Sequence, residues 1–356
     1  MAVYTGSYAY IQWAPEVTFN TAATNLRVHG ASCADGNRSE QFGFEQKITG
    51  WSFTQNKIPL TQLNSVKVKT FAYGQTRGSL SLDFVMASPW FLMLIGMNDS
   101  VETGSSAPFT HTYTLDCTTD NTAIRSFSTE IGQESGGTDI VRTLTGGIVN
   151  SASISTSIGE LVKVTLDTNY ANETVTTTLD ACAAGIAVSD HVPYTFAHGT
   201  ISSTDLDLAN AGQIQDFDVT FSQNADHIFG IGNSVAADKI RRLQEITGKI
   251  KVTNKTKTQL EKIYAQQKDT LANSACVSAV DTELTNIVVE FSKDADTAAS
   301  PSATSQVMQI TLKGVALDDI NVSIEPNEPI FQELNFQARE CVIVCKDTVK
   351  HQPDQD

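Results

Sequence analysis

The stretch that decides the fold is Thr76-Arg-Gly-Ser-Leu-Ser-Leu-Asp-Phe84, which leads into an apolar segment from Ser88 to Ile95. Later in the chain Ile246-Thr-Gly-Lys-Ile-Lys-Val-Thr253 matches it and is followed by a helix signal at Thr258. In both places a strand and a long polar loop come before the matching stretch. A long ordered set of elements that occurs twice indicates a duplicated domain.

Two glycine pairs give the spacing of this repeat. Gly78 and Gly248 are 170 positions apart, and Gly146 and Gly314 are 168 positions apart. We therefore predict two domains, at residues 26–175 and 194–346. The remaining segments are an N-terminal arm (1–25), a linker (176–193) and a flexible C-terminal tail (347–356).

Each predicted domain carries one short α-helix. In the first helix Ser88 is placed as the N-cap, Pro89 at the first helical position and Gly96 just past the end. The second helix begins at Thr258, with Glu261 three residues later in the capping-box pattern.

Strand patterns dominate the rest of the chain. Ser151-Ala-Ser-Ile-Ser-Thr-Ser157 alternates, and Leu161–Asp167 places Val162, Val164 and Leu166 on one face. The sequence thus predicts a mainly β protein with two tandem β-sandwich or barrel domains. Tyr4, Tyr8, Tyr10 and Trp13 mark the N-terminal arm as a strand, which covers either its own domain or a neighbouring subunit.

Composition excludes several classes of function. The net charge of the 356 residues is -16, which disfavours nucleic-acid binding by charge neutralisation. We expect no membrane contact, because no apolar run approaches the roughly 20 residues that a spanning helix needs. The six cysteines are sparse and irregularly spaced, which is typical of free thiols.

The sequence contains no recognisable catalytic or metal-binding motif. The six histidines lack ligand spacing, and Cys341 and Cys345 are most simply buried small hydrophobic residues. Asp318-Asp319 is most simply a solvated turn pair, with calcium binding as the alternative. We therefore predict a protein that is not an enzyme and needs no cofactor or metal.

The order of elements resembles that of tail tube proteins from tailed viruses of bacteria and archaea, over roughly residues 25–340. The resemblance rests on the Arg77-Gly78 strand that runs into Pro89-Trp-Phe-Leu92, and on Arg125-Ser-Phe-Ser-Thr-Glu-Ile-Gly132. It rests also on Arg142-Thr-Leu-Thr-Gly146, which leads to Val149-Asn-Ser-Ala-Ser-Ile-Ser155.

The resemblance implies stacked rings of six tube domains whose inner strands form one continuous barrel. Two domains in each chain then imply a homotrimer with pseudo-sixfold symmetry, with a hexamer as the alternative. The implied partners are further copies of the chain, the tape measure, the tail terminator, and baseplate or tip proteins. Viral DNA would pass through the lumen without specific binding, in a virion tail that is assembled in the host cytoplasm.

Long loops at Lys57–Phe71 and Asn224–Glu245 would stack one ring on the next, or else pack on their own domain. The candidate stacking residues are Ile58, Leu60, Leu63, Val66, Phe229 and Ile231. The polar sides of the strands supply candidate lumen residues, namely Glu130, Ser151, Ser153, Ser155, Asp167, Glu290 and Glu333.

Two other classes of function compete with a tail tube. A β-rich receptor-binding or carbohydrate-binding protein of a virion or cell surface would show clustered exposed aromatic residues. A β-type glycoside hydrolase would need a pair of carboxylates at a fixed separation, which no motif here nominates.

Overall fold

The computed structural model describes residues 9–23, 42–63, 66–99, 107–115, 124–133, 139–177, 192–203, 206, 208, 214–253, 285–293, 297–302, 305–323 and 330–347. The protein is mainly β, as predicted. The strands are β1 (Ala9–Pro15), β2 (Phe44–Thr61), β3 (Val68–Val85), β4 (Asn98–Asp99), β5 (Phe109–Leu115), β6 (Phe127–Gln133), β7 (Ile140–Ser157), β8 (Lys163–Tyr170), β9 (Asn172–Thr176), β10 (Thr200–Ser202), β11 (Ile214–Ser222), β12 (Asp226–Ile228), β13 (Asp238–Ile240), β14 (Glu245–Thr253), β15 (Thr285–Ser292), β16 (Val307–Ser323) and β17 (Phe331–Asp347). Two 3₁₀-helices lie among the described residues, η2 (Trp90–Ile95) and η3 (Phe196–His198).

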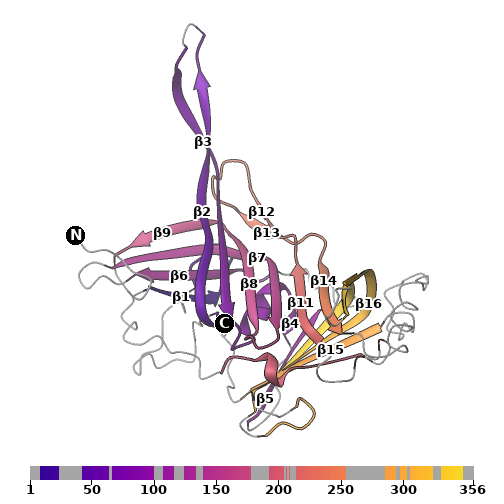
Figure 1. Ribbon diagram of the computed structural model, residues 1–356. Coiled ribbons are helices and arrows are strands. Elements are labelled where there is room, and N and C mark those ends of the chain that lie inside the picture. Colours follow the sequence, from indigo (N-terminus) through magenta and orange to yellow (C-terminus); the bar gives the residue numbers. More distant parts are fainter. Residues whose placement is uncertain are drawn as a thin grey trace.

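Both parts of the chain contribute to one 15-stranded antiparallel sheet (Figure 1). Its main path runs β10-β15-β16-β17-β14-β11-β7-β8-β3-β2. Among the described strands the sheet does not close into a barrel, and β7 pairs directly with β11 where two separate sandwiches were expected. This pairing satisfies backbone groups that two separate domains would leave exposed at their edges.

Strand pairing in the later part of the sheet follows the earlier part with a constant offset in residue number. A β-bulge separates Val149 from Ser151 where β7 pairs with β8, and another separates Leu317 from Asp319 where β16 pairs with β17. The second bulge thus lies 168 positions after the first. The strand order β2-β3-β8-β7 in the earlier part thus corresponds, strand by strand, to the order β11-β14-β17-β16 in the later part.

The registers of the β2–β3 and β11–β14 ladders correct the predicted match between Gly78 and Gly248. Trp51 pairs with Leu80 in the β2–β3 ladder, and Val219 pairs with Gly248 in the β11–β14 ladder, again at an offset of 168 positions. Gly248 therefore corresponds to Leu80 and not to Gly78, so the spacing of 170 drawn from the two glycines was wrong. Gly146 and Gly314, which keep the offset of 168, both adopt positive φ, at 66° and 62°.

The N-terminal arm packs on its own chain. Strand β1 pairs with β6 from Ala9 opposite Gln133 to Pro15 opposite Phe127. Trp13 is fully buried and stacks on Phe42 with ring centroids 5.7 Å apart. Of the two alternatives for the arm, the pairing agrees with a strand that covers its own domain.

The apolar segment after β3 forms a 3₁₀-helix and not the predicted α-helix. The helix η2 begins at Trp90, with Pro89 as its N-cap residue, and all six of its residues are buried. Short 3₁₀ turns tolerate such burial when neighbouring groups satisfy their terminal carbonyls. Here the side-chain amide of Gln223 donates to the Leu94 carbonyl (3.1 Å) and that of Gln244 donates to the Ile95 carbonyl (3.3 Å).

Both predicted loops contain strands. Residues 57–71 fall mostly within β2 and β3, which form a hairpin that projects from the sheet (Figure 1). Residues 224–245 hold the short β12–β13 hairpin where a long loop was expected. The helix predicted at Thr258, most of the linker and the C-terminal tail beyond residue 347 lie outside the described residues.

The two parts of the chain share one apolar core. Phe84 contacts Phe42 and Phe91, with ring centroids 5.7 and 5.4 Å apart. The same cluster includes Phe217 from β11 and Ile310 from β16. Burial of a common core stabilises both parts together, because separating them would expose this apolar surface.

Candidate lumen face and stacking hairpin

The sheet has one continuous polar face. In β8, Val164 and Leu166 are buried while Thr165 and Asp167 point to water. Cross-strand pairing carries the same alternation over β3, β7, β11, β14 and β17. The residues of this polar face are Ser81, Asp83, Ser151, Ser153, Ser155, Ser157, Lys163, Thr165, Asp167, Asp216, Asp218, Thr220, Ser222, Glu245, Thr247, Lys249, Lys251, Glu333, Asn335 and Gln337.

Hydroxyl groups hold the carboxylates of the polar face in place. Asp167 accepts hydrogen bonds from the Ser81 hydroxyl (2.6 Å) and the Ser151 hydroxyl (3.2 Å) on the two neighbouring strands. Two further bonds of this kind run from Thr165 to Asp83 (2.9 Å) and from Ser153 to Asp218 (3.2 Å). Serine and threonine therefore orient the negative charges across the strands while the charges stay in contact with water.

The structure places five of the seven candidate lumen residues together. Ser151, Ser153 and Ser155 lie on β7, Asp167 lies opposite Ser151 on β8, and Glu333 lies on β17. Strands β11 and β14 connect β7 to β17. All five therefore belong to the polar face.

Glu130 and Glu290 lie elsewhere. Their side chains are buried, with residue exposures of only 7% and 8%. Glu130 accepts hydrogen bonds from the Tyr10 hydroxyl (2.6 Å) and the Gln12 amide (3.1 Å), and Glu290 accepts one from the Gln309 amide (2.8 Å). A buried carboxylate with internal donors looks the same in a sequence as an exposed one, which is why polarity alone placed these two in the lumen.

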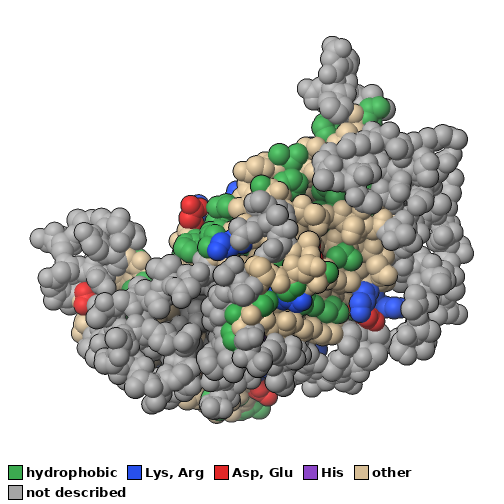
Figure 2. Space-filling model, turned by 90° about the horizontal axis from the view of Figure 1, so that it is seen from below, with side chains coloured by type: hydrophobic (Ala, Val, Ile, Leu, Met, Phe, Trp, Pro, Cys, Tyr) green, Lys and Arg blue, Asp and Glu red, His purple; other side chains and the backbone are tan. Residues whose placement is uncertain are grey.

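The sequence interpretation missed several members of the polar face. Asp216 and Asp218 on β11 lie opposite Lys251 and Lys249 on β14. The alternation in Asp216-Phe-Asp-Val-Thr-Phe221 carries the signal that identifies them, because Phe217, Val219 and Phe221 are all buried. In Figure 2, which views the molecule from below, the few visible charged side chains are scattered among hydrophobic and uncharged ones.

The β2–β3 hairpin exposes apolar side chains. Leu63 and Val66 at its tip are 100% and 102% exposed. Further exposed apolar residues along its strands are Ile58, Leu60, Val68, Phe71 and Tyr73. Between the tip and Gly78, where pairing with β8 ends, the two hairpin strands form ladders only with each other among the described residues. A hairpin with this many exposed apolar side chains is typical of a protein interface.

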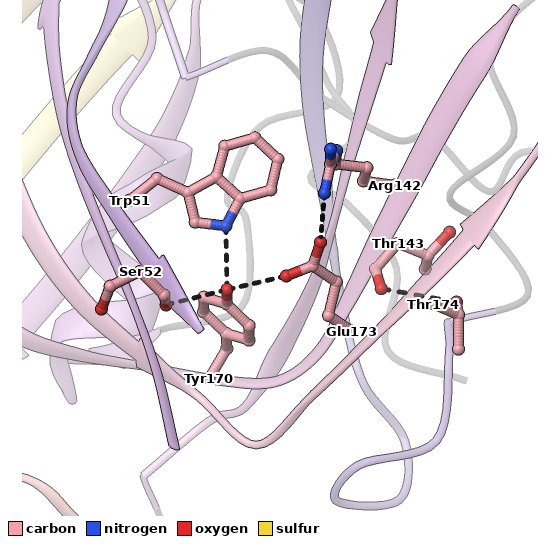
Figure 3. A network of polar contacts seen from close by, with 7 residues as sticks. All are labelled: Trp51, Ser52, Arg142, Thr143, Tyr170, Glu173 and Thr174. Atoms are coloured by element: carbon pink, nitrogen blue, oxygen red, sulfur yellow. Dashed lines mark hydrogen bonds and ion pairs between the residues drawn. The ribbon is translucent and has the colours of Figure 1, made fainter. Parts of the chain in front are cut away.

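A polar network anchors the base of this hairpin (Figure 3). The Trp51 indole donates to the Tyr170 hydroxyl (2.8 Å), which lies 3.0 Å from each of two acceptors for its proton, the Ser52 carbonyl and the Glu173 carboxylate. Arg142 forms an ion pair with Glu173 at 2.7 Å and also lies over the Trp51 ring at 4.7 Å. Burial raises the pKa of Tyr170, so its hydroxyl stays protonated.

The same network requires a glycine opposite Tyr170. A Cβ atom at Gly78 would lie 2.2 Å from the Tyr170 ring. Gly78 therefore allows the ring to cross β3 and reach β2. The network connects β2 to β7, β8 and β9 at the point where the hairpin leaves the sheet.

The shorter β12–β13 hairpin is attached to the first part of the chain. The His227 ring donates through Nε2 to the Gly146 carbonyl (3.0 Å), and Lys239 donates to the Ser126 hydroxyl (2.8 Å). The Arg77 guanidinium lies 5.2 Å from the Phe229 ring centroid. Of the two candidate stacking residues here, Phe229 is thus partly covered, whereas Ile231 is fully exposed.

Among the strand segments that have an unpaired side in the described part of the chain, two lie in β2 and β16. Strand β2 pairs with β3 on one side only. In β16, residues Asp319–Ser323 pair with β17, while the pairing with β15 ends at Val315. Both segments retain backbone donors and acceptors for another strand.

Within the described ranges, no group of three histidine, cysteine or acidic side chains is arranged to hold a metal ion. No helix in this part of the chain is long and apolar enough to cross a bilayer.

The geometry thus defines a β protein with a polar face, an apolar hairpin and free strand edges on β2 and β16. The family model for phage tail tube proteins matches residues 6–338, so the chain belongs to the phage tail tube family. It is a structural protein of a virion tail, in a family whose members assemble with copies of themselves and with other tail components. No curated protein matches the chain.

We expect the Tyr170→Phe substitution to destabilise the fold by about 1–3 kcal/mol, because it leaves the Trp51 N–H and the Ser52 carbonyl without their partner. Urea unfolding followed by circular dichroism measures this loss. The matched control is Tyr73→Phe on the exposed hairpin, which should leave the free energy of unfolding unchanged. Equal effects of the two substitutions would contradict a role of the network in stability.

Stability should also fall on mild acidification. Burial lowers the pKa of His227 from its usual 6.5, so below pH 6.5 the unfolded chain binds a proton that the folded chain still excludes. The free energy of unfolding therefore decreases as the pH falls from 6.5 to the lower folded-state pKa of this histidine. Burial raises the pKa of Glu16, which acts in the opposite direction.

The His227→Gln variant isolates the contribution of the histidine, because glutamine keeps a donor and does not titrate. Between about pH 7.5 and about pH 5.5 its melting temperature should drop less than that of the wild type. An equal drop in both proteins would show that His227 does not cause the dependence.

Proposed function

We propose that three copies of the chain form a closed ring and that the rings stack into the hollow tail tube through which viral DNA passes. In this proposal each chain supplies two tube modules related by duplication, so that the ring has pseudo-sixfold symmetry. The tube contacts the tape measure inside, and the tail terminator and the baseplate or tip proteins at its ends. Its role is passive and involves no reaction.

One observation carries the proposal: the pairing of β7 with β11 inside the chain can be repeated between neighbouring chains. Strand β7 pairs with β11 with Ile154 opposite Val219 and Ser153 opposite Thr220. The constant offset of 168 positions relates β7 to β16 and β11 to β2. These two related segments, in β16 and β2, each have a free edge among the described residues.

Applying the offset to this junction predicts a register between neighbouring chains. Trp51 of one copy lies opposite Val322 of the next, and Ser52 lies opposite Asn321. Val322 is 42% exposed in the single chain, and its contact with Trp51 would bury apolar surface on the core side. Ser52 and Asn321 would continue the polar face from one chain into the next. A closed ring of this kind removes both free edges.

The same arrangement turns the polar face toward the bore. The opposite face of the sheet belongs to the apolar core, which includes η2. The exposed hydroxyls and carboxylates of the polar face, including Ser151, Ser153, Ser155, Asp167 and Glu333, would then line the lumen. Their net negative charge disfavours adhesion of DNA phosphates.

Rings would stack through the β2–β3 hairpin. Its exposed apolar residues include four of the candidate stacking residues, Ile58, Leu60, Leu63 and Val66. Ile231 on the β12–β13 hairpin is exposed and would add a second contact. Burial of these side chains against an adjacent ring would remove the apolar surface from water.

Engineered disulfides test the register. The double variant Ser52→Cys/Asn321→Cys should form cross-links between chains under oxidation, because directly opposite residues meet the limit of about 7 Å between Cα atoms for a disulfide. On a non-reducing gel the cross-linked species should end at the trimer. The control Thr54→Cys/Asn321→Cys shifts the register by two residues, to separations of about 7–8 Å, and should cross-link poorly.

Cross-links from the control pair and not from the designed pair would contradict the register. A ladder that continues to six chains would replace the trimer with the hexamer. The wild type is the blank, since its described cysteines, Cys341 and Cys345, are buried.

Charge at the hairpin tip should block stacking but not ring formation. Leu63→Asp/Val66→Asp places two carboxylates where the proposal buries apolar side chains, so negative-stain microscopy should show rings without tubes. The control Val17→Asp/Val175→Asp adds the same charge at exposed positions outside the hairpin and should leave tubes intact. Tubes of normal length from the hairpin variant would exclude the hairpin from stacking.

A further inference from the structure

The polar face contains lysines as well as carboxylates. Lys163, Lys249 and Lys251 all lie on it. If this face lines the bore, each ammonium group points toward the path of the DNA. An accessible lysine binds phosphate and releases counterions, which would slow a passing genome.

Each of these lysines has a carboxylate as an immediate neighbour. The Lys163 ammonium forms an ion pair with Glu160 at 2.7 Å. Lys249 lies directly opposite Asp218 in the β11–β14 ladder.

Lys251 is enclosed by acidic residues on both sides. Its ammonium lies 4.0 Å from the Asp216 carboxylate on β11, and Glu333 lies directly opposite on β17. The same ammonium lies 4.9 Å from the centroid of the Phe331 ring. The charged groups belong to one hollow of about 250 Å³, whose lining includes Asp216, Asp218, Lys249, Lys251 and Glu333.

We propose that Asp216, Asp218 and Glu333 screen Lys249 and Lys251 from DNA phosphates, so that the bore stays non-adhesive although it contains cations. This inference rests on the proposed lumen. The screening is local, because the opposing charges lie well within the Debye length of about 8–10 Å in physiological salt. A phosphate that approaches the hollow meets three carboxylates together with two ammonium groups.

Screening explains the placement of the charges better than stabilisation does. An exposed ion pair contributes only about 0–1 kcal/mol to stability.

The test measures DNA binding by purified tubes and by unassembled protein, with a short labelled duplex. The variant Asp216→Asn/Glu333→Gln removes both carboxylates beside Lys251 and should bind the duplex at low salt, where the wild type does not. Exposure of Lys251 in three chains gives about three phosphate contacts per ring, so affinity should fall about 40-fold between about 50 and 200 mM salt.

Two controls separate screening from net charge. Asp167→Asn/Glu245→Gln removes two charges from the same face away from these lysines and should not create binding. Adding Lys251→Gln to the first variant should greatly weaken the binding. Equal binding by the charge-matched control, or no binding by the first variant, would overturn the proposal. Tube formation is observed by microscopy, independently of DNA binding. If the wild type forms no tubes, that result would count against the tail tube function and not against screening.

Discussion

Backbone pairing between β7 and β11 is the interaction on which the rest of the structure depends. Together with the pairing of β5 with β17, it joins the two parts of the chain into one sheet. It also aligns their apolar faces over one core and their polar faces into one surface. A sheet that is extended in this way still ends in edges, which a soluble protein must cover or pair. The arrangement of β2 and β16 follows from that constraint, since each has a free side where β11 and β7 have partners.

Apolar and polar side chains alternate along the strands, so the two faces of the sheet have different roles. The buried side supplies the apolar area that stabilises the fold, while the other side stays polar over six neighbouring strands. Because side chains alternate with period two, a register slip of one residue would exchange the faces. The bulges at corresponding positions of β7 and β16 keep corresponding side chains on the same face of the sheet in both parts.

The two hairpins differ although they hold corresponding places in the sheet. The β12–β13 hairpin is tied to the first part of the chain through His227 and Lys239. The β2–β3 hairpin is held at its base, where Trp51, Tyr170 and Glu173 form a compact network (Figure 3). A rigid base lets the exposed apolar tip keep its direction, which suits a contact with another copy of the chain.

Residue patterns alone were enough to predict the β class, the strands of the alternating segments and the core side of β8, because period-two patterning follows from strand geometry. The sequence also indicated the spacing of 168 through Gly146 and Gly314. Tertiary structure alone decided that Glu130 and Glu290 are buried with internal donors, and that Asp216 and Asp218 lie beside lysines. It also decided that residues 57–71 form a projecting hairpin and that η2 is a 3₁₀-helix. Such outcomes depend on contacts between residues far apart in the chain, and local patterns do not encode them.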